Sequence, residues 1–528
     1  MLASVWSATV IGVNGELVRV EADIGRGLPS FDIVGLPDTS VMEARDRVRS
    51  ALRNAGFDFP LARITVNLAP AQLPKGGAGF DLPIAMTVLA ASNQIKDDNC
   101  DSWLFMGELG LDGSARFTPG TLPATLAARE KGLKCVVVPP ANAAECHLVP
   151  GIAVAPLGHL RDLPQLLDQI SDGSFPKAGG RGREHHQLPR RPSSGTDLIL
   201  DLVVGQESAK RGLEVAAAGG HNLLMCGPPG VGKTLLARCI AQLLPGLEEE
   251  QVLEVTRIYS AAGILAPGRL IQSRPFRAPH HSCTRAGMVG GGTVPVPGEV
   301  TLAHRGVLFL DELGEYSREI LELLRAPMED KCITVSRSRI SVTFPADFML
   351  VAAMNPCPCG YYGSDASEGG QVCKCRDGDI RRYHRRVSGP IIDRFDLFLW
   401  VDRPHSSNLE PGANKVAVRG GEGQGSRQGQ VADRVAAARA VQLHRFRSEP
   451  IYTNSEMGRV HFDRYCQLSP KGRGLLGQAY RSLGLSMRAH DRIIKLGRTI
   501  ADLDGSQRID ANHIGEAIQY RERPHHLL

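Results

Sequence analysis

Residues 227–234, with the sequence Gly-Pro-Pro-Gly-Val-Gly-Lys-Thr, constrain the fold of this chain more than any other segment. They follow the apolar run 222–226 and precede a helix-forming stretch at 235–241. A glycine-rich loop between a strand and a helix lets backbone N–H groups surround phosphate oxygens, and the helix N-terminus adds its positive end. The segment therefore predicts a phosphate-binding loop within an α/β sheet.

This loop supplies the candidate residues for binding a nucleoside triphosphate. They are Gly227, Pro228, Pro229, Gly230, Val231, Gly232, Lys233 and Thr234. In loops of this kind the lysine reaches the β- and γ-phosphates and the hydroxyl ligates Mg²⁺. The alternative is a glycine turn that matches by chance, and the complete spacing with both flanks correct argues against it.

Two further apolar segments end in polar side chains. Residues 306–312 have the pattern of a buried strand that ends in Asp311 and Glu312, and residues 348–355 that of a strand ending in Asn355. In doubly wound sheets the carboxyl ends of the strands form the phosphate-binding edge. Asp311 is expected to hold Mg²⁺ and Glu312 to activate the attacking water. Asn355 would bond the γ-phosphate or that water, or else only cap the turn that follows.

Arg394 lies further along the chain, in the segment 390–396. An arginine there could enter the site of a neighbouring subunit and stabilise the charge of the transition state. It could equally form an internal ion pair with Asp393 or Asp396. The spacing alone leaves both readings open.

Four of the twelve cysteines form two Cys-x-Cys pairs, Cys357 with Cys359 and Cys373 with Cys375. Four thiolates on two short turns suit a tetrahedral Zn²⁺ site, and a closed shell of four sulfurs leaves no open position for catalysis. We therefore predict a structural zinc ion here. A redox pair or four unreactive thiols are the alternatives.

A basic segment begins at the second cysteine pair. It contains Lys374, Arg376, Arg381, Arg382, Arg385 and Arg386, with Tyr383 and His384 interleaved. Such a cluster could hold a phosphate backbone and stack on bases, or it could form a subunit interface leading to Arg394. The formal net charge of +5 over 528 residues permits a nucleic-acid partner but does not argue for one.

Chain length and local composition predict several domains, because 528 residues are too many for one core. Polar stretches rich in glycine and serine at 171–197 and 406–430 are predicted linkers. They separate residues 1–170, 198–405 and 431–528, of which the last has a helical pattern. The N-terminus is a poor signal peptide and no apolar stretch is long enough to cross a bilayer, so we expect no membrane association and a cytoplasmic location.

Taken together, these motifs resemble those of an AAA+ ATPase. Several longer tracts are similar to the ComM/YifB family of bacterial competence proteins, in the magnesium-chelatase-like group; they are 274–282, 297–304, 485–490 and 498–503. The resemblance covers nearly the whole chain. It implies an α/β fold, in which a P-loop AAA+ core with a C-terminal helical lid follows a Lon-like α+β domain.

The resemblance also implies roles that spacing alone does not give. ATP and Mg²⁺ would be bound between the subunits of a homo-oligomeric ring, expected to be a hexamer. Arg394 would act in trans on the neighbouring site. Arg488, at the start of a lid helix, would sense the γ-phosphate in cis; without the resemblance it would be an ordinary surface arginine at a helix N-terminus.

Residues 74–83 and 107–113 resemble the catalytic domain of Lon protease. Lon uses a serine nucleophile that a lysine activates. The corresponding positions are Gly79 and Leu122, so both catalytic groups are missing. We predict a Lon-like domain without peptidase activity that serves as a scaffold or a DNA-binding platform.

The resemblance implies a ring-forming, ATP-dependent DNA motor. It would act as a branch-migration helicase in recombination or natural transformation, with single-stranded or branched DNA as its partner. One alternative is the ATPase motor subunit of a metal chelatase. Another is an ATP-dependent unfoldase or chaperone, against whose protease form Gly79 and Leu122 argue.

Overall fold

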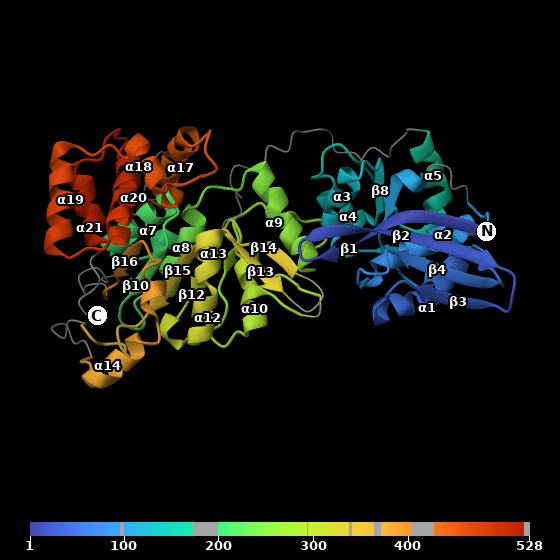
Figure 1. The fold of residues 1–528 in the computed structure, drawn as a ribbon, viewed down its shortest axis with the longest axis horizontal. Coiled ribbons are helices and arrows are strands. Elements are labelled where there is room, and N and C mark those ends of the chain that lie inside the picture. The colour runs from blue at the N-terminus through green and yellow to red at the C-terminus, as the bar shows by residue number, and fades with distance from the viewer. Residues whose placement is uncertain are drawn as a thin grey trace.

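The computed structural model describes seven ranges of the chain: 1–95, 100–172, 199–292, 294–336, 341–363, 371–403 and 427–521. They form three parts, which we call the N-terminal lobe (1–172), the central lobe (199–403) and the C-terminal helices (427–521). Figure 1 shows the N-terminal lobe at one end of the molecule, the C-terminal helices at the other and the central lobe between them.

The N-terminal lobe is built on a mixed sheet of seven strands in the order β3-β4-β2-β1-β5-β8-β9. Its elements are β1 (Leu2–Ile11), β2 (Asn14–Gly25), β3 (Ser30–Val34), α1 (Thr39–Asn54), β4 (Arg63–Ala69), α2 (Asp81–Ala91), β5 (Trp103–Phe105), β6 (Glu108–Leu109), β7 (Ala115–Arg116), α3 (Thr121–Glu130), β8 (Cys135–Val138), α4 (Pro140–Cys146), β9 (Ala153–Pro156) and α5 (Leu163–Ser171).

Strands β1, β2 and β4 pair antiparallel, whereas β3, β5, β8 and β9 join the sheet in parallel. In β4 the alternate residues Ile64, Val66 and Leu68 are buried, as the period of a half-buried strand requires. Every residue of α2 is buried. This explains why its sequence is apolar on all sides rather than on one face.

The central lobe contains a parallel sheet of five strands in the order β11-β12-β15-β10-β16. Its elements are α6 (Ile199–Leu202), α7 (Glu207–Gly219), β10 (Leu223–Cys226), α8 (Lys233–Leu243), α9 (Glu249–Ala261), β11 (Phe276–Arg277), α10 (Arg285–Val289), α11 (Glu299–Leu302), β12 (Val307–Leu310), α12 (Arg318–Leu323), α13 (Arg325–Asp330), β13 (Cys332–Ser336), β14 (Ser341–Pro345), β15 (Met349–Met354), α14 (Asp377–His384), α15 (Gly389–Ile392) and β16 (Leu397–Trp400).

The strands predicted within 222–226, 306–312 and 348–355 are confirmed as β10, β12 and β15. All their residues are buried, because helices and loops cover both faces of a parallel sheet. The mixed α/β architecture with a parallel sheet is the one expected of an AAA+ core.

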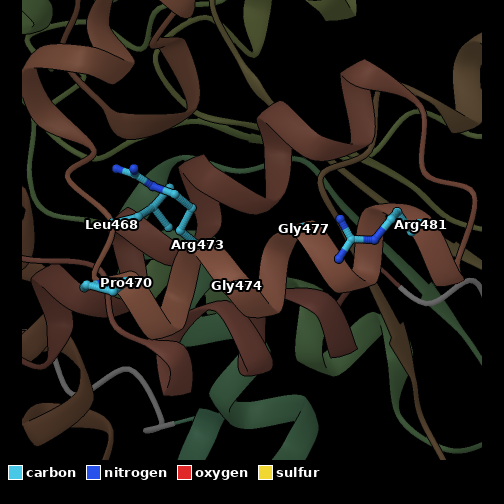
Figure 2. A pocket seen from close by; sticks show the side chains of 6 residues that line it. All are labelled: Leu468, Pro470, Arg473, Gly474, Gly477 and Arg481. Carbon is cyan, nitrogen blue, oxygen red and sulfur yellow. The ribbon is translucent and has the colours of Figure 1, made fainter.

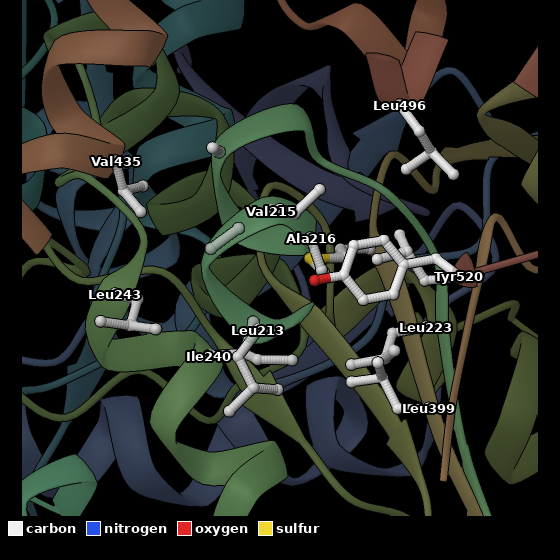
Figure 3. Close-up of a cluster of buried hydrophobic side chains, with 14 of the residues drawn as sticks. Leu213, Val215, Ala216, Leu223, Ile240, Leu243, Leu399, Val435, Leu496 and Tyr520 are labelled. Carbon is white, nitrogen blue, oxygen red and sulfur yellow. The ribbon is translucent and has the colours of Figure 1, made fainter. Parts of the chain in front are cut away.

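The C-terminal helices pack directly against the central lobe. They are α17 (Arg427–Arg445), α18 (Arg459–Tyr465), α19 (Pro470–Ser482), α20 (Met487–Leu503) and α21 (Ala511–Gln519). Figure 3 shows part of the shared hydrophobic core: Tyr520 lies beside Leu223 and Leu399 of the sheet, and Val435 and Leu496 belong to the same cluster. Burial of these side chains fixes the helices on the sheet.

Most of the two predicted linkers, 171–197 and 406–430, lies outside the described residues. At the edges the structure refines the predicted boundaries. Ser171 is the last residue of α5, and α17 already begins at Arg427, before the predicted boundary at 431. None of the helices within the described ranges combines the length and the apolar character needed to span a membrane.

The N-terminal lobe is held on the central lobe by a small apolar cluster. Val13, in the turn between β1 and β2, packs with Ile258 of α9, Leu302 of α11, and Val342 and Phe344 of β14. The contact is close, because a Cβ at Gly12 would lie 2.2 Å from Cγ1 of Val342. The two lobes are therefore joined through α9 and the hairpin β13–β14.

Replacing Phe344 tests this junction. Phe344 is fully buried, so Phe344→Ala should lower the free energy of unfolding by about 3–5 kcal/mol, and it should speed proteolysis between the lobes. Urea denaturation and limited proteolysis measure both effects. The matched control is Thr343→Ala, on the exposed face of the same strand, which should change stability by less than about 0.5 kcal/mol. Equal behaviour of the two variants would contradict a packed junction.

Candidate nucleotide site

The phosphate loop lies between the end of β10 at Cys226 and the start of α8 at Lys233. This confirms the predicted strand–loop–helix arrangement. Gly230 and Gly232 have φ angles of +79° and +89°, in the region that favours glycine. A Cβ at Gly227 would lie 2.1 Å from the carbonyl oxygen of Val401. Only glycine therefore allows the loop to start so close to the segment that follows β16.

The Lys233 side chain lies inside this loop. Its ammonium group donates hydrogen bonds to the carbonyl oxygens of Gly227 and Pro228, at 2.6 and 2.8 Å, and to Oδ1 of Asn355 at 3.0 Å. Burial lowers the pKa of the Lys233 amine, and the carboxylates of Asp311 and Glu312 oppose that shift. The structure thus brings Lys233 and Asn355 together, as the strand ends predicted.

Thr234 and Asp311 form the second contact of the site, because Oγ1 of Thr234 donates to Oδ2 of Asp311 at 2.7 Å. These are the two oxygen ligands predicted for Mg²⁺, so both are placed for one hard cation. Glu312, the next residue, has a left-handed backbone with φ of +50°. This conformation is uncommon for a residue with a side chain and is found at functional sites.

A cavity of about 280 Å³ adjoins these groups and contains residues that the motifs did not single out individually. Thr234, Asp311 and Glu312 line it together with Arg238, Phe276, His280 and His281. Nδ1 of His281 lies 4.0 Å from Oε2 of Glu312. Phe276, His280 and His281 belong to the tract 274–282 noted in the sequence, but only the parallel pairing of β11 with β12 shows where that tract lies.

Arg394 lies at the opposite edge of the same sheet. It comes before β16, and Leu397 at the start of β16 is level with Leu223 at the start of β10. The phosphate loop follows the other end of β10, about 13 Å away at roughly 3.3 Å per residue. Arg394 therefore points away from the phosphate loop of its own chain.

The ion-pair partner of Arg394 is Glu329 of α13, at 2.5 Å, which the sequence did not single out. The guanidinium also donates to the carbonyl oxygen of Pro390 at 2.7 Å. Asp396, one of the two aspartates considered, instead pairs with Arg492 of α20 at 3.0 Å. Arg394, Asp396 and Arg492 line a cavity of about 440 Å³ at this edge.

Arg488 is exposed in the first turn of α20. Arg492 and Lys495, four and seven residues later, line the cavity beside Arg394, and residues at these spacings share one face of a helix. No hydrogen bond or ion pair between described residues joins Arg488 to the phosphate loop. Its role therefore stays a prediction, and its position favours the edge of the sheet that carries Arg394.

Cys357, Cys359, Cys373 and Cys375 come together, with their sulfur atoms all within 4.8 Å of one another. The separations are 3.3 Å from Cys357 to Cys359, 3.7 Å from Cys357 to Cys373 and 3.6 Å from Cys359 to Cys373. Zinc–sulfur bonds of about 2.3 Å in a tetrahedron place the sulfurs roughly 3.8 Å apart. The four thiols could therefore hold one metal ion, and their geometry fits zinc.

Part of the basic segment 374–386, Asp377–His384, folds into α14. All six cations are exposed. Arg386 pairs with Glu315 at 2.9 Å and Arg382 with Asp379 at 3.7 Å, while the other four form no ion pair with described residues. Tyr383, one of the two aromatic side chains of this segment, is buried against Gly314 and so is not available to stack on bases in this structure. The surface is therefore basic without that aromatic platform.

Another basic surface is a hollow on α19, outside the nucleotide site. Figure 2 shows Arg473 and Arg481 on the same helix, on either side of Gly474 and Gly477. A Cβ at Gly474 would meet no atom within 4 Å, so this face of the helix is open. None of the predicted site residues lines this hollow.

In the N-terminal lobe, apolar packing closes both positions that correspond to the catalytic pair of Lon. Leu122 is fully buried in α3. Gly79 is buried too, and a Cβ there would lie 2.9 Å from Cγ2 of Thr118 and 3.3 Å from Cε of Met106. Neither position offers an exposed polar group.

Comparisons with known proteins agree with this geometry. Family models match three segments: "Magnesium chelatase, subunit ChlI" at residues 199–409, "Subunit ChlI of Mg-chelatase" at 20–142, and "Magnesium chelatase, subunit ChlI C-terminal" at 425–521. The protein YifB of Escherichia coli K12 and the competence protein ComM of Haemophilus influenzae are each 42% identical over 520 residues, covering 98% of this chain and 97% of theirs. Lon protease 2 of Bacillus subtilis is 31% identical over 196 residues, which cover 32% of this chain and 34% of that protein.

Proposed function

The chain belongs to the ComM/YifB family of magnesium-chelatase-like proteins, and from this premise we propose that it is a ring-forming ATPase that drives branch migration of DNA in recombination or natural transformation. The proposal depends on one observation: the candidate catalytic residues are divided between two opposite edges of one sheet. Lys233, Thr234 and Asp311 lie at one edge, and Arg394 lies at the other.

At the first edge the residues suit hydrolysis of ATP. Lys233 would bind the β- and γ-phosphates, and Thr234 and Asp311 would hold Mg²⁺. Glu312 would accept a proton from the attacking water, while Asn355 orients the water or the γ-phosphate. Protein groups fixed in this way stabilise the developing charge without reorganising.

The second edge completes the site of a neighbour. In the proposed assembly, the sheet edge that carries Arg394 in one subunit contacts the phosphate loop of the next subunit. Such a contact joins two different surfaces, and repeated contacts of this kind form a ring when the rotation closes. We expect six subunits. Arg488 would join Arg394 at the same seam, rather than act in cis, because it shares a face of α20 with Arg492. ATP turnover would then depend on assembly.

DNA is proposed as the substrate on two grounds. The first is full-length similarity to a protein named for competence. The second is the set of exposed cations of α14 and the preceding segment, which suit phosphate contacts. The four cysteines beside them are proposed to bind a structural zinc ion. The named family models favour one alternative, the motor subunit of a metal chelatase.

Two substitutions separate nucleotide binding from hydrolysis. Glu312→Gln should lower ATP turnover by about 10²-fold or more, because it removes the proton acceptor, and it should leave ATP affinity nearly unchanged. Lys233→Ala should remove binding itself, since the phosphates lose their main cation. Steady-state ATPase assays and titration with a fluorescent nucleotide distinguish them. A Glu312→Gln protein that retains full turnover would exclude Glu312 as the base.

The seam between subunits can be tested by mixing variants. Arg394→Ala should lower turnover by about 10³-fold yet retain nucleotide binding, because its own phosphate loop is intact. Mixing it with Lys233→Ala should restore part of the activity, since some seams then combine an intact loop with an intact Arg394. No recovery in rings shown to be mixed would mean that Arg394 serves its own subunit only.

The DNA assignment predicts that four-way-junction DNA raises ATP turnover. Replacing Lys374, Arg376, Arg381 and Arg385 by Ala should weaken DNA binding and reduce the slope of log K against log salt by roughly 0.9 per lost phosphate contact. The control is the pair Arg473→Ala and Arg481→Ala on α19. ATP turnover that does not change with DNA but rises with a porphyrin would favour the chelatase alternative. ATP turnover that rises with an unfolded protein would favour an unfoldase.

A further inference from the structure

The four-cysteine cluster lies directly against the phosphate loop. A turn joins Cys357 to Gly360, whose N–H donates to the carbonyl oxygen of Cys357 at 2.9 Å. Gly360 has a φ of +86°, and a Cβ there would lie 2.7 Å from Cδ of Pro229. The tip of this turn therefore touches the third residue of the phosphate loop.

The same turn is tied to the lysine of the loop. Asn355 lies two residues before Cys357, and its side-chain oxygen accepts the hydrogen bond from Lys233. Nε2 of His384 lies 2.8 Å from the carbonyl oxygen of Pro356, which anchors α14 to this stretch. The first cysteine pair is thus connected to the phosphate loop at both Pro229 and Lys233.

The second cysteine pair leads toward the other half of the site. Cys373 and Cys375 precede α14, whose Tyr383 packs against Gly314, two residues after Glu312. Arg386 donates to the carbonyl oxygen of Gly314 at 3.2 Å. A metal ion that joins the two cysteine pairs would therefore connect the phosphate loop with the segment that carries Glu312.

We propose that the four-cysteine knuckle, residues 357–360 and 373–375, is a positioning element of the nucleotide site. A metal ion bound by the four thiols sets the position of Pro229 and Asn355, so nucleotide affinity depends on the metal although the metal does not touch the nucleotide. This inference rests on the proposed nucleotide site and is independent of whether DNA is the substrate.

Gly360→Ala tests the contact without touching a metal ligand. The added methyl group meets Pro229 in a backbone conformation that alanine disfavours, so the phosphate loop must shift. Because small misplacements are costly at such sites, we expect the KM for ATP and the Kd for a fluorescent ADP analogue to rise about tenfold. The metal content should stay that of the wild type. Unchanged nucleotide affinity in a metal-loaded variant would overturn the proposal.

The matched control is Gly378→Ala, in the first turn of α14, where an added Cβ meets no atom within 4 Å. It should leave the ADP affinity, the KM for ATP and the metal content unchanged. A control variant that loses affinity as much as Gly360→Ala would also overturn the proposal, because the effect would then not come from the contact with Pro229.

Metal removal provides a second, independent measurement on the full-length protein. After chelation, checked by elemental analysis, the protein should bind the ADP analogue at least about tenfold more weakly, and added zinc should restore the affinity. Circular dichroism shows whether the fold is retained. If the fold is lost, the outcome is decided by Gly360→Ala, which needs no metal removal. Equal affinity with and without metal in folded protein would contradict the proposal, whereas an absence of DNA-stimulated turnover would contradict only the proposed function.

Discussion

The parallel pairing of β12, β15, β10 and β16, adjacent in that order, is the constraint on which the nucleotide site depends. β15 pairs with both β10 and β12, with Leu223 and Val307 near the start of each ladder. Since the strands run in one direction and the starts of β10 and β12 are offset by two residues along β15, their carboxyl ends lie at the same edge. Lys233, Asp311 and Asn355 follow those ends, so residues distant in sequence form direct hydrogen bonds.

The same register separates Arg394 from the phosphate loop of its own chain. β16 is also parallel to β10, so the residues that precede it, including Arg394, necessarily lie at the edge away from the phosphate loop. No rotamer of an arginine side chain crosses the buried sheet between the two edges. An arginine in this position could reach an ATP molecule only if a second copy brought its phosphate loop to that edge. In the proposed ring, coupling between turnover and assembly would follow from strand direction.

The sequence was informative wherever a pattern is local. Apolar runs that end in polar residues predicted β10, β12 and β15 correctly, and the cysteine spacing predicted the cluster that the structure brings together. It was uninformative about contacts between distant segments. The pair of Arg394 with Glu329, the approach of Gly360 to Pro229 and the burial of Tyr383 depend on tertiary packing, for which a single sequence gives no register.

The N-terminal lobe is mechanically continuous with the nucleotide site, and this follows from where the two are joined. The apolar cluster around Phe344 lies on β14, and β15 begins only a few residues later and ends next to Asn355. Close-packed interiors transmit displacement rather than absorb it. β15 in turn positions Asn355, which accepts the hydrogen bond from Lys233. The junction at β14 therefore places the N-terminal lobe only a few residues of chain away from the strand that positions Asn355.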